Sequence, residues 1–256
     1  MLALKLFLVP VLIAMVTFAG RWRGPALAGM LAGCPVVAAP VLLLVAIQYG
    51  PGFAVSATAG AMYAPLANAS FCLGYAWAAT RFPWWISLTG GLFSYAIAGG
   101  LLIGLTPSAY PTLFLTIPSL WLIWRSFPTN MELSATPSRS AGDLPARMIA
   151  GAVLVMVVTF AAPALGPRLS GILSGFPVLG CVLASSSHRV EGPEFVIRLL
   201  KGMVTGFYTM LFFIFTLAIL LPEWGITHSF IMAFAIGTLI QIGTVGMKPF
   251  TLPRTR

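Results

Sequence analysis

The chain is poor in ionisable side chains. Its 256 residues include five Asp and Glu, two His and 14 Lys and Arg, so that only 7% of the residues are charged. The carboxylates fall mostly between apolar stretches, and neither they nor the histidines have the spacing of an acid–base pair or a metal site. We therefore expect no enzyme activity, no catalytic residue, no bound metal and no cofactor.

Cysteine is also scarce. Cys34, Cys72 and Cys181 lie in apolar segments, and their spacing fits neither a disulfide framework nor a zinc motif. They are interpreted as small core residues. A glycine-rich phosphate loop ending in a lysine is missing as well, which argues against ATP as the energy source of this chain alone.

Apolar residues are abundant, at 59% of the chain, and the mean hydropathy is +0.98. A soluble core of ordinary proportions cannot hide so much apolar surface. The apolar residues come in blocks of roughly 17 to 28, which suits helices that cross a hydrocarbon layer about 30 Å thick. The fold class is therefore predicted to be an all-α polytopic membrane protein.

About nine transmembrane helices are predicted, each bounded by Gly, Pro or charged residues. They cover Leu2–Gly20, Pro25–Ile47, Phe53–Thr80, Pro83–Leu105, Ala109–Trp124, Met148–Ala162, Pro167–Ser186, Glu194–Leu221 and Ile226–Met247. A polar linker separates the fifth helix from the sixth.

The two halves of the chain share a pattern at one fixed offset. A shift of 142 positions aligns VTFA at Val16–Ala19 with VTFA at Val158–Ala161, and the sparse Gly and Pro residues follow without a gap: Gly24-Pro25 with Gly166-Pro167, Gly29 with Gly171, Gly33 with Gly175, Pro35 with Pro177, and Gly50-Pro51 with Gly192-Pro193. Such self-similarity indicates a duplicated unit. We predict a first four-helix repeat at residues 1–106, a linking transmembrane helix and cytoplasmic linker at 107–145, and a second four-helix repeat at 146–256.

The basic residues predict the orientation in the membrane. With nine crossings, 12 of the 14 Lys and Arg fall on one face and only Lys5 and Arg168 on the other. Because basic residues collect on the cytoplasmic side, the N-terminus is predicted outside and the C-terminus in the cytoplasm. The linking helix then turns the second repeat upside down. The net charge of +9 is interpreted as this orientation signal, and nucleic acid is not an expected partner.

Two predicted helices carry a break. The sequence GMLAGCP at Gly29–Pro35 returns as GILSGFP at Gly171–Pro177. Proline removes a backbone donor and disfavours helical torsions in the residue before it. Paired breaks near the middle of the membrane predict a shared cavity with free backbone groups for a solute. The predicted substrate-binding residues are Gly29, Gly33, Cys34, Pro35, Gly171, Gly175, Phe176, Pro177 and the equivalent pair Thr17 and Thr159.

Other interpretations of these residues stay open. The glycines have the G-x-x-x-G spacing of closely packed helices, and the threonine hydroxyls can bond back to their own helices. Seven further polar residues can line a polar path or join helices: Ser56, Thr58, Asn68, Ser70, Thr205, Tyr208 and Gln241. Glu194 and Arg198, at i and i+4, can form a gate or coupling site at the cytoplasmic start of a helix, or an ordinary surface pair.

The stretches GILSGFPVLGCVLA and EGPEFVIRLLKGMVTGFYTMLFFIFTLAIL resemble the four-helix GlpM-like family of small bacterial inner-membrane proteins. That family has a similar glycine followed by Phe-Pro in its second helix. The resemblance covers much of the second half, and more faintly the first, where Cys34 stands in place of the aromatic residue before Pro35. It implies a bacterial inner membrane and a four-helix unit, so that this chain would be a fused, inverted pair of such units. Together with the distribution of basic residues, this predicts a multi-pass protein with a periplasmic N-terminus. The family is associated with exopolysaccharide production but has no established activity.

Inverted repeats with broken helices are typical of secondary transporters. The function predicted is therefore a secondary membrane transporter for a small solute or lipid-linked molecule, working by alternating access. The alternative is a non-catalytic membrane subunit or assembly factor of a larger inner-membrane complex, and a passive channel is a third option. The expected partners are membrane lipids, a small-molecule or lipid substrate and, as one option, a second copy of the chain.

Overall fold

The computed structural model describes residues 2–36, 38–105, 108–128, 144–164 and 175–246. These ranges form α-helices joined by short turns, and none of them contains a β-strand. The helices are α1 (Leu2–Arg23), α2 (Pro25–Gly33), α3 (Ala38–Ala61), α4 (Ala64–Ala79), α5 (Trp84–Ile103), α6 (Ala109–Arg125), α7 (Leu144–Ala164), α9 (Val178–Glu191) and α10 (Pro193–Gly246). The predicted all-helical class is confirmed.

Three segments of the described chain are long and apolar enough to cross a membrane. They are Pro25–Gly50, Trp84–Leu102 and Pro193–Thr244, and a shorter apolar helix covers Leu144–Phe160. The third segment is far longer than one crossing needs, because α10 bends at Gly225 into two arms. The nine-helix count stays a prediction, since part of the predicted seventh helix lies outside the described residues.

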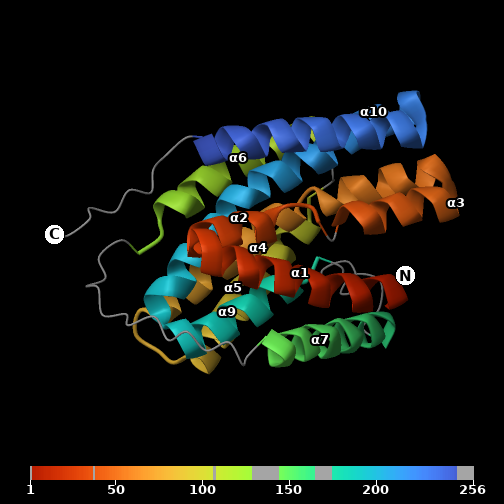
Figure 1. Ribbon diagram of the computed structural model, residues 1–256. Coiled ribbons are helices and arrows are strands. Elements are labelled where there is room, and N and C mark those ends of the chain that lie inside the picture. The colour runs from red at the N-terminus through yellow and green to blue at the C-terminus, as the bar shows by residue number, and fades with distance from the viewer. Residues whose placement is uncertain (1, 37, 106–107, 129–143, 165–174, 247–256) are drawn as a thin grey trace.

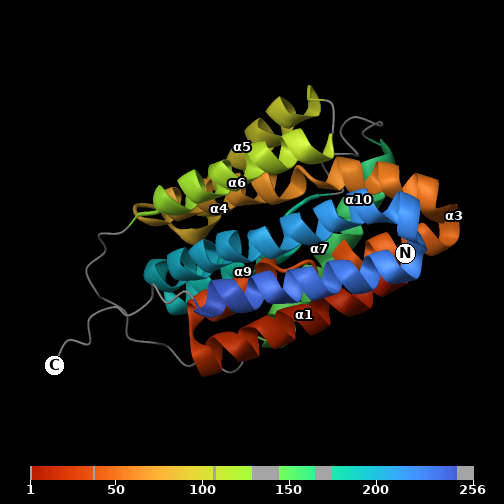
Figure 2. The same ribbon diagram turned by 90° about the horizontal axis from the view of Figure 1, so that it is seen from above.

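The helices form an elongated bundle in which the chain runs back and forth between two ends (Figure 1). The N-terminus of α1 and the bends within α3 and α10 gather at one end, which lies to the right in Figure 1. Seen from above, α5, α6 and α4 form one side of the bundle and α1 the opposite side, with α9 and α10 between them (Figure 2).

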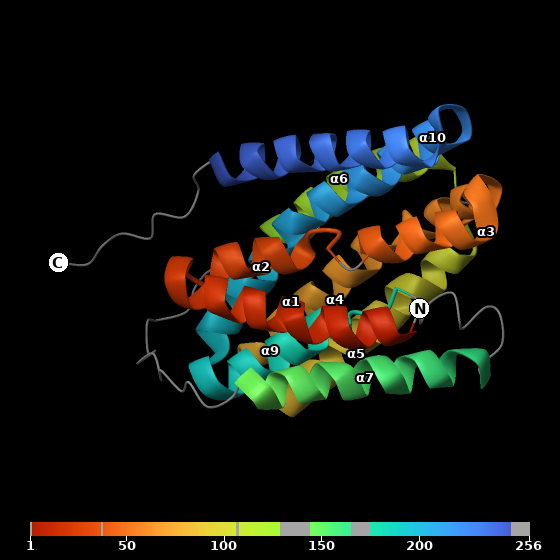
Figure 3. The same cartoon turned by 45° about the vertical axis from the view of Figure 1, so that its right-hand side comes forward.

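Helices α1 and α7 lie side by side and run in opposite directions (Figure 3). Gly151 of α7 packs against Val9 and Ile13 of α1. Arg21, in the last turn of α1, and Arg147, in the first turn of α7, both act on the charge of Glu191. The end of one helix therefore meets the start of the other.

The first arm of α10 runs antiparallel to α6. Tyr208 donates a hydrogen bond from its hydroxyl to the carbonyl of Ile117 over 3.4 Å, and the Lys201 ammonium lies 4.3 Å from the ring centroid of Trp124. Trp77, near the end of α4, donates from Nε1 to the carbonyl of Ser126 over 2.9 Å. The ends of α4 and α6 thus share the bundle end at which α10 starts.

Glycine lets α2 and α10 approach until their backbones touch. A Cβ on Gly29 or Gly33 would collide with the carbonyls of Leu199 or Met203 on α10. In return, a Cβ on Gly202 or Gly206 would collide with carbonyls of α2. The G-x-x-x-G spacing is therefore used for packing, as in close helix pairs of membrane proteins.

The helix breaks at Pro35, as the sequence predicts. Helix α2 ends at Gly33, Cys34 is extended with φ −67° and ψ 159°, and α3 starts at Ala38. Pro177 likewise precedes the first residue of α9, although the residues 165–174 before it are outside the described ranges. Both breaks use the same bonds: the amide of Val36 donates to the carbonyl of Cys34, and that of Val178 to Phe176, each over 2.8 Å.

A second matched position supports the same offset. Gly50 has φ 81° and ψ 170°, and Gly192, 142 positions later, has φ 87° and ψ 174°. This left-handed region is costly for residues with a Cβ, and each glycine is followed by a proline that starts the next helix. The chain therefore turns in the same way at two glycines that lie 142 positions apart.

One segment that was predicted as a single helix is interrupted in the structure. Phe53–Thr80 was expected as a single span, but α3 ends at Ala61 and α4 begins at Ala64. Pro65 explains the interruption, since it has no amide hydrogen to donate to the preceding turn. The other described helix boundaries agree with the prediction to within a few residues. The exceptions are the helix ends near Gly50-Pro51 and Gly192-Pro193.

Gly29→Ala is expected to lower the free energy of unfolding by about 1–3 kcal/mol, because the added methyl overpacks the contact between α2 and α10. Gly100→Ala is the matched control, since a Cβ there meets nothing within 4 Å. Both free energies are measured by chemical denaturation in detergent micelles. Equal stability of the two variants would contradict the packing role.

Candidate functional site

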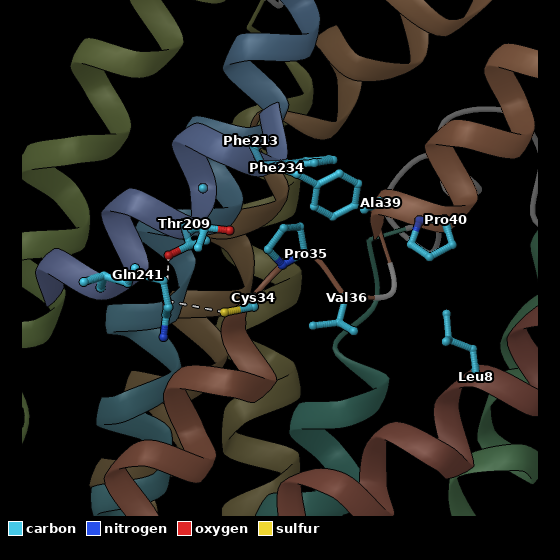
Figure 4. A pocket seen from close by; sticks show the side chains of 13 residues that line it. Leu8, Cys34, Pro35, Val36, Ala39, Pro40, Thr209, Phe213, Phe234 and Gln241 are labelled. Atoms are coloured by element: carbon cyan, nitrogen blue, oxygen red, sulfur yellow. Dashed lines mark hydrogen bonds between the residues drawn. The ribbon is translucent and has the colours of Figure 1, made fainter. Parts of the chain in front are cut away.

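A pocket of about 400 Å³ lies beside the break between α2 and α3. Its wall combines residues from α1, the break itself, α3 and both arms of α10 (Figure 4). The lining residues are Leu8, Cys34, Pro35, Val36, Ala39, Pro40, Thr209, Phe213, Phe234, Gly237, Thr238, Gln241 and Ile242. The volume is within the range of about 300–1,000 Å³ that small-molecule sites have.

The break itself builds one side of the pocket. The extended Cys34 and the tight turn at Pro35 take the chain out of the helix, so Cys34, Pro35 and Val36 face the space between α3 and α10 (Figure 4). The amide of Ala39 then donates to the carbonyl of Pro35 over 2.8 Å and starts the next helix. A continuous helix at this position has no such opening.

Gln241 connects the break to both arms of α10. Its Oε1 accepts a hydrogen bond from the Thr209 hydroxyl over 2.7 Å and faces the Cys34 thiol at 3.4 Å. Its Nε2 is buried and has no hydrogen-bond partner among the described groups. Gln241 therefore does both things that its sequence position allowed, since it lines the pocket and joins helices.

Aromatic side chains surround the second Gly-x-Pro stretch, Gly175–Pro177, which lies 142 positions after the first. Cys34 corresponds to Phe176 and Gly237 to Tyr95 at the offset of 142. The rings of Tyr95 and Phe176 pack edge to face, with centroids 5.9 Å apart. Phe71, the equivalent of Phe213, is fully buried. Two aromatic rings thus occupy one break, and two small residues leave the other open.

Of the predicted binding residues, Cys34 and Pro35 lie in the wall of the pocket. Gly29 and Gly33 contact α10 instead. Gly175 accepts a hydrogen bond at its carbonyl from Asn68 Nδ2 over 3.3 Å, and Gly171 lies outside the described residues. Phe176 and Pro177 form the second break, which does not contribute to the wall.

The two equivalent threonines differ in their surroundings. Thr17 is buried, and its hydroxyl has no hydrogen-bond partner among the described groups, so the expected bond back to its own helix is not formed. Thr159 lies on α7 and is partly exposed. Neither residue lines the pocket.

Charged groups interact at the end of the bundle that carries the basic residues. Glu194 and Arg198 form an i, i+4 ion pair in the first turns of α10. Arg147 of α7, only 5% exposed, donates from its guanidinium to Glu191 of α9 over 3.3 Å. Burial raises the pKa of the Glu191 carboxyl, while Arg147 and Arg21 act in the opposite direction. The sequence spacing did not indicate this second pair, because its partners lie on different helices.

In the described ranges no three His, Cys, Asp or Glu side chains come together. Comparisons with protein families, with curated proteins and with solved structures give no match. The resemblance to the GlpM-like family therefore stays a prediction.

Glu191→Gln is expected to lower the free energy of unfolding by about 3 kcal/mol, because the guanidinium of Arg147 is left buried without a counter-charge. The matched control is Glu194→Gln, which removes a pair on one helix and should cost about 0.3–0.5 kcal/mol. Both values come from chemical denaturation in detergent micelles. Equal losses for the two variants would contradict a special role for the pair between α7 and α9.

Proposed function

We propose that the chain is a secondary membrane transporter for a small solute or lipid-linked molecule, and that its substrate binds in the pocket at the break between α2 and α3. The observation that carries this proposal is the position of a pocket of about 400 Å³ at an interrupted apolar helix. In transporters, broken helices of this kind supply the binding site near the middle of the membrane.

The depth of the break supports this proposal. Helix α2 starts just after Arg23 and has nine residues before the break. At 1.5 Å per residue the helix is about 13 Å long, which is close to half of a hydrocarbon layer about 30 Å thick. If Arg23 lies at the membrane surface, Pro35 and the pocket lie near the midplane.

An inverted repeat is the second part of the proposal. The matched bonds at Pro35 and Pro177 and the matched torsions at Gly50 and Gly192 support a duplicated unit. The antiparallel pair of α1 and α7, which are equivalent helices in the two halves, supports the inversion. Such a relation lets each half take the conformation of the other, which is the basis of alternating access.

The placement proposed is the bacterial inner membrane, with the end of the bundle that carries Arg21, Arg147 and Lys201 in the cytoplasm. The gathering of these residues at one end supports the orientation, because basic loops are retained inside. The bacterial inner membrane itself rests on the resemblance of the second half to the GlpM-like family.

The test is flux into liposomes that contain this protein alone. The probes are uncharged radiolabelled solutes and fluorescent NBD-labelled lipids, whose transfer between leaflets is read by dithionite quenching. We expect flux of at least one probe, and a loss of about tenfold or more, roughly 1.4 kcal/mol, in Gly237→Tyr, which places a ring in the pocket.

Gly243→Tyr serves as the matched control, since it adds the same ring on the same arm of α10 where a Cβ meets nothing within 4 Å. It should keep the flux of the unmodified protein. Absence of flux for every probe would overturn the transporter proposal. A stoichiometric partner that copurifies with such an inactive protein would instead support the membrane-subunit alternative.

A further inference from the structure

The wall of the pocket carries no charged side chain. None of its 13 lining side chains is Lys, Arg, His, Asp or Glu, and most are apolar. A charged group placed there would be desolvated without a counter-charge, which costs several kcal/mol. The pocket therefore excludes anions and cations, and selects for an uncharged occupant.

The filled second break shows which chemistry suits this space. At the second break, the benzene ring of Phe176 and the phenol ring of Tyr95 fill the space. In the open break the same two positions hold Cys34 and Gly237, which leave the corresponding volume free. An apolar body of about that size, carrying one hydroxyl or carbonyl oxygen, would replace what the rings provide.

A hydrogen-bond donor is available for that oxygen. Nε2 of Gln241 is buried without a partner, while Oε1 is engaged by Thr209 and Cys34. The terminal torsion of a glutamine side chain is soft, so the amide can turn Nε2 toward the pocket, and Oε1 then turns away from Thr209 and Cys34. An oxygen that accepts this bond would remove the cost of an unsatisfied buried amide.

The pocket opens on the apolar flank of the bundle. Three residues of its wall are exposed there: Val36 at 38%, Phe234 at 50% and Ile242 at 63%. In a chain that spans a membrane, this flank faces lipid. The path into the pocket therefore leads from the hydrocarbon layer and suits a molecule already dissolved in it.

We infer that the pocket binds an uncharged, membrane-dissolved lipid with one hydroxyl or carbonyl group, which accepts a hydrogen bond from Gln241 and fills the volume left by Cys34 and Gly237. A bulk phospholipid is not the occupant, because its tail would leave Gln241 unpaired and the wall has no cation for its phosphate. This inference rests on the proposed function for its biological meaning, but binding is measurable without flux.

The experiment is photolabelling of the full chain in phosphatidylcholine vesicles. The probe is a long-chain fatty alcohol with a diazirine in its chain, and the adducts are located by mass spectrometry of peptides. We expect adducts on peptides that contain Cys34 and Phe234, and competition by unlabelled fatty alcohol. Two further probes carry the same chain on a fatty-acid carboxylate and on a phosphatidylcholine, and both should label these peptides at least about tenfold less.

Variants test the site itself. Gly237→Tyr should remove the adducts, Gly243→Tyr should keep them, and Gln241→Leu should reduce the preference for the alcohol over a plain hydrocarbon probe. Equal labelling by the phosphatidylcholine or carboxylate probe would overturn the inference, and so would labelling that Gly237→Tyr leaves unchanged. A fold-preserving check on each variant is its elution as a single peak in detergent.

Binding and transport can fail separately. Labelling at the pocket without flux in the same vesicles would overturn the transporter proposal and keep the ligand class. Flux that persists in Gly237→Tyr, while labelling is lost, would place transport elsewhere in the molecule. Flux that the variant abolishes, without labelling by the alcohol, would overturn the ligand class alone.

Discussion

The missing amide hydrogen of Pro35 is the constraint on which the site depends. A proline after Cys34 cannot continue the helix, and it forces the residue before it into an extended conformation, which is seen at φ −67° and ψ 159°. The chain then needs a short turn before α3 begins, and that turn opens a space among apolar side chains. Gln241 and Thr209, which are hydrogen-bonded to each other, form the side of the pocket that α10 supplies.

The glycines that precede the break have a different role, which is helix packing. Gly29 and Gly33 bring the backbone of α2 onto that of α10, where Gly202 and Gly206 receive it. This contact fixes the first half-helix in place and leaves the residues after it free to line a pocket. A single motif, GMLAGCP, thus combines a packing face with a break, and each of its parts has a separate physical role.

The sequence was enough to predict the helical class, most helix boundaries and the break at Pro35, since these follow from local rules for apolar blocks, Gly and Pro. It missed the interruption next to Pro65, because this proline lies within a long apolar segment that was interpreted as one helix. It did not show that Gly29 and Gly33, which it assigned to the binding site, pack against α10. Spacing along one helix cannot show which neighbour a face will meet.

The asymmetry between the two breaks was visible in part. The difference between Cys34 and Phe176 was evident from the alignment of the halves, but the matching difference between Gly237 and Tyr95 gains meaning only when the two rings are seen in contact. The pair of Arg147 and Glu191 was hidden for the same reason, because its partners are 44 positions apart and lie on different helices. The features that the sequence did not predict are therefore contacts between different helices.

The central claim is that two equivalent halves face opposite sides of one membrane. It is tested by placing single cysteines at Gln48 and Val190, which are equivalent at the offset of 142, in a chain whose native cysteines are replaced by alanine. The account predicts that a membrane-impermeant maleimide labels position 48 only from outside and position 190 only from the cytoplasmic side. Labelling of both positions from the same side would contradict it.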